Sequence, residues 1–211
     1  LRHRVNPNLS IEVHAVLNAA MNYFMFALSH EEAAPPAAMN EVLRRGLAEP
    51  VKLKGSYGSF FKGEFDDTIF KASIVVNRCN FFSSPRMVAK DVRERRYLDE
   101  GALHSLFRSR DRRYIVSFFR EAPPPEDIVG GFSHHIRGEM RDRDLWITAG
   151  FKRVTEYPYS RLKIPGAQNA VFTIEGEDGR NGTTYLEGLG AGPDPTVAAM
   201  IQDLKRLTRG A

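Results

Sequence analysis

The sequence lacks the residues and runs that build several common kinds of site. Its single cysteine, Cys79, excludes an internal disulfide and any multi-cysteine metal centre. It ends an apolar run, which is typical of a small buried thiol. No run of 18 apolar residues is present, and the nearest candidate, 15–28, is too short and contains Asn18 and Asn22. The sequence therefore predicts no membrane-spanning segment.

The standard catalytic motifs are also missing. The chain has no Walker loop, no strand-linked GxGxxG, no HExxH and no GxSxG. The glycines of 188–192 (GLGAG) are followed by no βαβ unit, which favours a loop. His134 and His135 would point about 100° apart on a helix, and Glu139 could add only one ligand to His135. We therefore predict no cofactor and no metal.

The overall composition is that of a globular protein. Hydrophobic residues make up 42% and charged residues 27%, and the net charge of +4 is mild. The densest basic cluster, 93–96 (RERR), is interrupted by Glu94, as on a solvated and salt-bridged helix face. RNA binding would rest on the basic pI alone, so no nucleic-acid partner is expected.

The first third of the chain predicts helices followed by strands. Apolar residues recur at helical spacing over 10–28, with Ser10 as the N-cap, and a second helix is expected over 37–47. From Pro50 onward, alternating apolar and polar residues and then β-branched residues such as Thr68 and Ile74 favour strands at 51–57, 60–65 and 68–77.

The middle of the chain mixes helices with one clear strand. An apolar stripe predicts helix over 85–110, divided near Gly101. Residues 113–120 (RYIVSFFR) have the composition of a buried strand, and a helix is expected over 126–140. Short extended or helical pieces are expected at 145–147 and 153–154.

The last part predicts a hairpin and a helix. Strands at 170–176 and 183–188 flank a turn, and Asp194 would cap an amphipathic helix that extends to about residue 207. Helices and antiparallel strands occur in groups along the chain and do not alternate one by one, and this order predicts the α+β class. We expect an N-terminal helical extension over 1–49 and an α+β domain over 50–211.

Three stretches carry a resemblance to a known family. They are LKGSYGSFFKGEFDDTIFKASIVVN, RYIVSFFREAPPPEDIVGGFSHHIR, and the final hairpin and helix from AVFTIEG to VAAMIQDLKRL. In order and spacing they resemble chalcone-isomerase-like proteins, over about 50–207. The resemblance implies an open-faced β-sandwich, with a large antiparallel sheet and helices packed on one face.

The family's catalytic residues are not retained under this resemblance. Their places fall at residues of other types, namely Ser59 or Phe60, Lys71, Ile128 and His135. Without the family's arginine, no fixed cation would hold a developing phenolate or a fatty-acid carboxylate. The resemblance therefore implies a protein that is not an enzyme, and it leaves Tyr57, Lys71 and His135 as candidate ligand-binding residues.

Three functions follow as hypotheses. The first is a structural accessory subunit of a larger mitochondrial complex, of the ATP synthase or respiratory kind, with other protein subunits as partners. The Arg excess, the lost site residues and a first residue other than Met motivate this hypothesis and the mitochondrial location. The second is a protein that binds a fatty acid or another small apolar ligand. The third is an active isomerase with an altered site.

Overall fold

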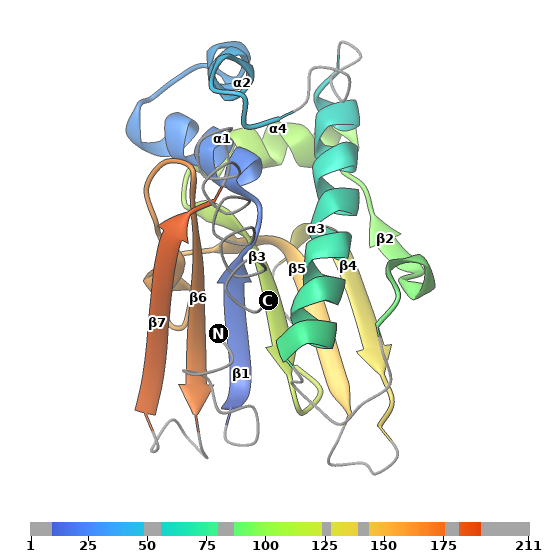
Figure 1. Ribbon diagram of the computed structural model, residues 1–211. Coiled ribbons are helices and arrows are strands. Elements are labelled where there is room, and N and C mark those ends of the chain that lie inside the picture. The colour runs from blue at the N-terminus through green and yellow to red at the C-terminus, as the bar shows by residue number, and fades with distance from the viewer. Residues whose placement is uncertain are drawn as a thin grey trace, which may run out of the picture.

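The described residues form one antiparallel sheet. In the computed structural model these residues are 10–48, 56–79, 87–123, 128–138, 144–175 and 182–190. They contain β1 (Ser10–Val16), β2 (Glu94–Arg96), β3 (Arg112–Phe119), β4 (Val129–Ile136), β5 (Leu145–Arg153), β6 (Gln168–Glu175) and β7 (Gly182–Leu189). The strands lie side by side in the order β2-β4-β5-β3-β1-β6-β7 (Figure 1). The strand nearest the N-terminus is thus well inside the sheet.

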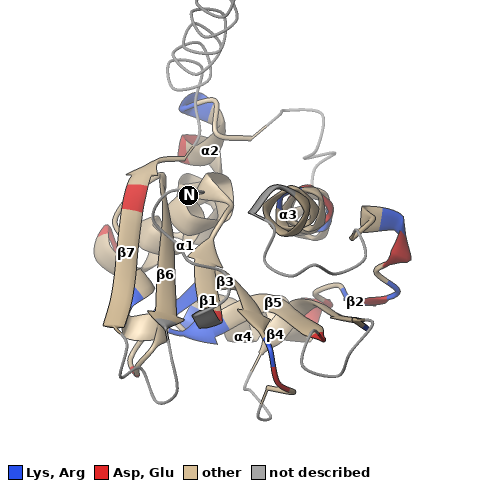
Figure 2. Cartoon of the chain, turned by 60° about the horizontal axis from the view of Figure 1, so that its bottom comes forward, with Lys and Arg blue, Asp and Glu red and all other residues tan. Residues whose placement is uncertain are grey.

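Helices cover one face and one end of this sheet. They are α1 (Ala19–His30), α2 (Pro35–Arg44), α3 (Tyr57–Cys79) and α4 (Glu100–Arg108), with short 3-10 helices η2 (Ala89–Asp91) and η4 (Tyr159–Leu162). The long helix α3 lies along the sheet, whereas α1, α2 and α4 gather at one end (Figure 1). Figure 2 looks down the axis of α3 and shows the helix to one side of the strands. The α+β class predicted from the sequence is confirmed.

The two faces of the sheet bury different cores. Successive side chains of a strand point to opposite faces, so each strand contributes to both. Ala15, Val116 and Phe118 belong to the main core, which they share with α1 and α3. On the opposite face, a smaller core packs beneath η4 and contains Val16, Ile115, Val154, Leu162, Ile164, Ala170 and Phe172. We call this second face the helix-free face, since the α-helices α1 and α3 lie on the other side and only the short 3-10 helix η4 is described here.

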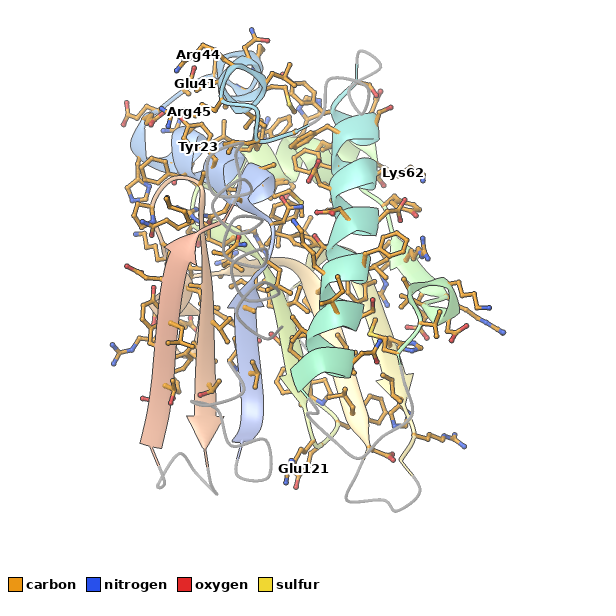
Figure 3. The ribbon with its side chains drawn as sticks, viewed as in Figure 1. Tyr23, Glu41, Arg44, Arg45, Lys62 and Glu121 are labelled. Carbon is orange, nitrogen blue, oxygen red and sulfur yellow. The ribbon has the colours of Figure 1, made fainter. Side chains whose placement is uncertain are left out.

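Several elements were predicted correctly. The buried strand expected over 113–120 is β3, and the hairpin expected at the end of the chain is β6 and β7. The helix expected over 37–47 is α2. It is held against α1 by Arg45, whose guanidinium lies 4.5 Å from the centre of the Tyr23 ring. Glu41 forms ion pairs with both Arg44 and Arg45 at this end of the molecule, and Figure 3 labels the three side chains.

The prediction of a helix from residue 10 is half wrong. Residues 10–16 form β1, and the helix begins only at Ala19. β1 pairs with β3 along one edge and β6 along the other. Both of its faces are buried, since Val13 and Ala15 lie in the main core and Val16 in the smaller one. A strand buried on both faces need not alternate apolar and polar residues, and its apolar positions can therefore match a helical spacing.

The strands predicted over 60–65 and 68–77 are also wrong, because this stretch is the continuous helix α3. Its buried residues Phe61, Phe65, Ile69, Ala72 and Val76 recur every three or four positions and form one face against the sheet. The β-branched residues that suggested strands lie partly on the exposed side. Burial of this face therefore outweighs the local preference of the β-branched residues for strand.

Three further expectations are corrected in the middle of the chain. The helix predicted over 126–140 is the strand β4, and the short pieces expected at 145–147 and 153–154 are parts of one strand, β5. The helix predicted over 85–110 is helical only in η2 and α4, with β2 between them. In each case strand pairing decides the structure: β4 pairs with the next strand β5 and with the more distant β2, and β5 also pairs with β3.

Some predictions fall outside the described residues. The boundary expected at residue 50 and the helix expected from Asp194 lie there, so both stay predictions. Among the described residues, no helix is both long enough and apolar enough to span a membrane.

At Gly131 the backbone of β4 lies close to that of β5. Its φ of 111° lies in the region that favours glycine, and a Cβ built there would lie 1.9 Å from the carbonyl oxygen of Ala149 on β5. The β4–β5 register shifts at this point, between Val129 and Phe132. We predict that Gly131→Ala lowers the free energy of unfolding by about 2 kcal/mol or more, because both backbone strain and overpacking oppose it.

Urea denaturation measures this change. The matched control is Gly188→Ala on β7, where a Cβ would have no neighbour within 4 Å. A loss for Gly131→Ala no larger than that for the control would contradict the importance of the close approach.

Candidate functional site

Asn18 lies between β1 and α1 and bonds to both α1 and α3. Its Oδ1 accepts a hydrogen bond from the backbone N–H of Met21 at 2.9 Å, which caps α1. Its Nδ2 donates to the Glu64 carboxylate at 2.7 Å and to the Asp67 carboxylate at 3.3 Å. Asn18 is itself buried, so one amide joins the end of a central strand to two carboxylates of α3.

These carboxylates share one side of α3 with a lysine. Glu64 is only 3% exposed, whereas Asp67 lies one turn further along and reaches the surface. Lys71 Nζ lies 2.8 Å from Asp67 Oδ2, and the side chains of the pair are 39% and 32% exposed. Polar groups thus extend from the buried Asn18 and Glu64 to an ion pair that solvent can reach. We call Asn18, Glu64, Asp67 and Lys71 the α3 polar site.

The exposure of the Asp67–Lys71 pair limits what it can contribute to stability. Ion pairs on a protein surface contribute about 0–1 kcal/mol, and those at i,i+4 on a helix contribute about 0.3–0.5 kcal/mol. The Asp67–Lys71 pair can nevertheless take part in the chemistry of a bound molecule. An ammonium held by a carboxylate can donate a proton or a hydrogen bond to an oxygen of a bound molecule, and the carboxylate can accept from a substrate ammonium or hydroxyl.

Apolar side chains lie next to this pair. Phe70 and Ile74 are exposed by 61% and 59%, and they follow Asp67 and Lys71 by three residues each. Residues three or four positions apart share one side of a helix. The outer side of α3 therefore combines a charged pair with exposed apolar surface.

The structure separates the three site residues that the sequence predicted. Lys71 lies in the α3 polar site. Tyr57 begins the same helix, about 21 Å from Lys71 along its axis. Its ring packs against Phe24 and Phe107, and burial raises the pKa of its hydroxyl.

His135 lies on β4, on the helix-free face. Its ring stacks on Trp146 with centroids 3.7 Å apart, and its Nε2 lies 2.9 Å from Asp144 Oδ2. The pKa of Asp144 is lowered most by a hydrogen bond from the Gly138 backbone N–H. The hydrogen bond with His135 lowers it further. The sheet lies between His135 and α3, so His135 and Lys71 cannot form one site.

The sequence did not predict three of the four members of the α3 polar site. Asp67 lies between the strands predicted over 60–65 and 68–77, so no functional role was predicted for it. The i,i+4 spacing of Asp67 and Lys71 becomes informative only once the segment is known to be a helix. Asn18 was interpreted only as a polar break in an apolar stretch, and nothing local links it to Glu64.

The described residues hold no group of three or more His, Cys, Asp or Glu side chains that could bind a metal ion. Of the glycine-rich stretch 188–192, Gly188 is part of the edge strand β7, and residues 191–192 lie outside the described part of the chain.

Solved structures with a similar fold are homoserine dehydrogenases. The enzyme from Thermoplasma acidophilum superposes with a TM-score of 0.58 and 16% sequence identity, over 95% of this chain and 50% of that one. The S. aureus enzyme gives a TM-score of 0.51 and 16% identity, over 95% and 43% of the two chains. The Thiobacillus denitrificans enzyme gives 0.51 and 18%, over 96% and 40%.

These similarities show the fold and no more, because the identities are low. The chain spans about half the length of these structures or less. No family model matches the chain, and no curated protein matches it significantly.

The comparisons overturn the family and the function expected from the sequence. The resemblance to chalcone-isomerase-like proteins is wrong, since the similar solved structures are homoserine dehydrogenases. The accessory-subunit, lipid-binding and isomerase hypotheses lose their basis with it. The expectation of a protein that is not an enzyme is also contradicted by these structures, which are those of enzymes. The mitochondrial location stays a prediction.

The hydrogen bonds of Asn18 make it the structural support of the α3 polar site. We predict that Asn18→Ala lowers the free energy of unfolding by about 1–3 kcal/mol, because it removes a helix cap and leaves the buried Glu64 carboxylate without its amide partner. Urea denaturation followed by far-UV circular dichroism measures this loss.

The matched control is Asn40→Ala, at an exposed position of α2. It is expected to change stability by no more than about 0.5 kcal/mol. Equal effects of the two substitutions would contradict the supporting role of Asn18.

Proposed function

We propose that this chain is the substrate-binding part of a dehydrogenase that interconverts a small amino alcohol and its carbonyl form, with homoserine as the type of substrate. The observation that carries the proposal is the solvent-accessible Asp67–Lys71 pair, supported by the buried Asn18 and Glu64. The similarity of the fold to homoserine dehydrogenases suggests the reaction class.

The pair suits the proton transfer of this reaction. When a carbonyl becomes an alcohol, its oxygen gains a proton, and the Lys71 ammonium is placed to donate it. In the reverse direction the Lys71 amine accepts the proton from the alcohol. The Asp67 carboxylate keeps Lys71 in place and has further lone pairs with which to bind the substrate's ammonium.

A dehydrogenase also needs a hydride carrier, commonly a nicotinamide dinucleotide. Such dinucleotides bind at a Gly-rich turn between a strand and a helix in a parallel βαβ unit. The strands of the described residues all pair antiparallel, so these residues do not fit a dinucleotide. We infer that the hydride carrier is held elsewhere, in keeping with the fact that the chain spans only part of the similar structures.

The apolar residues beside Lys71 support the same arrangement. Phe70 and Ile74 would be covered if a part that holds the hydride carrier packed against this side of α3. Covering them would also exclude water from Lys71, which strengthens electrostatic interactions with the substrate.

Binding of two related amino acids tests the role of Lys71 directly. L-homoserine carries a hydroxyl that L-2-aminobutyrate lacks, and a site that bonds to this hydroxyl discriminates against the analogue. We expect calorimetry to show tighter binding of homoserine to the unmodified chain. Lys71→Met is expected to abolish the preference, because its side chain has similar length but no proton to donate.

Lys62→Met is the matched control. Lys62 lies on the same helix and also forms an i,i+4 ion pair, with Asp66 at 3.2 Å, but it is not in contact with the α3 polar site (Figure 3 labels it). This variant should keep the preference for homoserine. Equal binding of the two amino acids to the unmodified chain, or an equal loss in both variants, would refute the proposal.

A further inference from the structure

A second candidate site lies across the sheet from Lys71. It is a cavity of about 510 Å³. This volume lies within the range of small-molecule sites, about 300–1,000 Å³. The lining residues come from β4, from β5, from the segment that leads into β2 and from the segment that follows β3. The proposed dehydrogenase site uses none of them.

Part of the cavity lining belongs to a row of polar residues on the helix-free face. The row crosses five strands from β2 to β1, and its members are register partners in turn, namely Glu94, Ser133, Thr148, Ser117 and His14. Register partners present their side chains on one face of the sheet. This is the helix-free face, because Val116 and Phe118, the neighbours of Ser117 on β3, belong to the main core. The first three members of the row line the cavity.

The two sides of the cavity differ in polarity. The strands lie in the order β2-β4-β5-β3, so residues near β2 and residues that follow β3 line opposite sides (Figure 1). On the β2 side, Asp91, Arg93 and Glu94 are all exposed. The β3 side is apolar and consists of Ala122 and Pro123. The cavity therefore offers hydrogen-bonding groups on one side and apolar surface on the other.

An aromatic pair lies between these two sides. His135 of β4 and Trp146 of β5 are register partners, two residues along from Ser133 and Thr148, and their side chains are therefore on the same face. The two rings are stacked with an angle of 6° between their planes and centroids 3.7 Å apart. Both residues line the cavity, where Trp146 adds apolar ring surface.

The charges on the β2 side alternate in sign. Arg93 stands between Asp91 and Glu94 in the sequence, and all three line the cavity. A carboxylate only accepts hydrogen bonds, and a guanidinium only donates them. A hydroxyl does both, so neighbouring hydroxyls of one ligand can bond to acids and to the base between them.

We propose that this cavity binds the ring of a neutral sugar. The hydroxyls of the ring bond to Asp91, Arg93 and Glu94, and its C–H groups pack against Trp146 and Pro123. An anion would meet two carboxylates and a cation would meet the guanidinium, and such like-charge contacts oppose binding. A purely apolar ligand would remove water from three charged groups without replacing their hydrogen bonds.

The single tryptophan of the chain reports on this cavity. We expect at least one neutral sugar among D-glucose, D-galactose, D-mannose, D-xylose and D-ribose, added singly at millimolar concentration, to change the fluorescence of Trp146. At least one monodeoxy analogue of that sugar should bind about tenfold more weakly, because a charged group then lacks its hydroxyl partner. The amino and uronic-acid forms of the sugar should bind no more tightly than the neutral form.

Adenosine distinguishes a free sugar from the ribose of a nucleoside. Adenosine that binds more tightly than D-ribose would identify the ring as part of a nucleoside. A free sugar that binds at least as tightly as adenosine would identify the ligand as a free sugar. Both results support recognition of a sugar ring.

Exposed variants test the contacts without endangering the fold. Glu94→Met and Arg93→Met should each weaken binding by about tenfold, because methionine forms no such hydrogen bonds to a hydroxyl. The matched controls Glu187→Met and Arg96→Met change exposed residues that do not line the cavity, and they should leave binding unchanged. Lys71→Met should also leave it unchanged, which separates this site from the proposed dehydrogenase site.

Three results would overturn the proposal. They are the lack of a Trp146 response to all five sugars and to adenosine, tighter binding of the amino or uronic-acid form, and equal effects of Arg93→Met and Arg96→Met. Each is distinct from the homoserine preference, which depends on Lys71 and is measured by calorimetry.

Discussion

Asn18 makes the contact on which the candidate site depends. The last residues of β1 place this side chain over the sheet, where one amide caps α1 and reaches two carboxylates of α3. A buried carboxylate costs several kcal/mol unless it is hydrogen-bonded. The Asn18–Glu64 bond therefore helps to fix how α3 lies on the sheet, and with it the position of the Asp67–Lys71 pair one turn further along.

The sheet separates two chemically different surfaces. On the α3 side, an apolar core carries a helix whose outer side presents the Asp67–Lys71 pair next to exposed Phe70 and Ile74. On the helix-free face, a polar row crosses the strands and ends in a cavity. Because every strand contributes side chains to both faces, a ligand bound on one face contacts the same strands that support the other.

The sequence predicted local structure well and distant partners poorly. β3 and the β6–β7 hairpin were recognisable because a dense apolar run and a short turn are local signals. α3 was missed because its β-branched residues favour strand locally, whereas burial of Phe61, Phe65 and Ile69 against the sheet decides for helix. Lys71 was named a ligand-binding candidate from an alignment that proved wrong. Its partner Asp67 becomes visible only on the helix, and Asn18, distant in sequence, only in the fold.

A double-mutant cycle between Asn18 and Glu64 tests the central claim most directly. The free energies of unfolding of the unmodified chain, Asn18→Ala, Glu64→Met and the double variant are measured in urea, since methionine is of similar length to glutamate but cannot accept the hydrogen bond. If the amide–carboxylate contact joins the sheet to α3, the two substitutions are coupled by about 1 kcal/mol or more. Effects that add to within about 0.3 kcal/mol would show that the two side chains act independently, and would contradict the account.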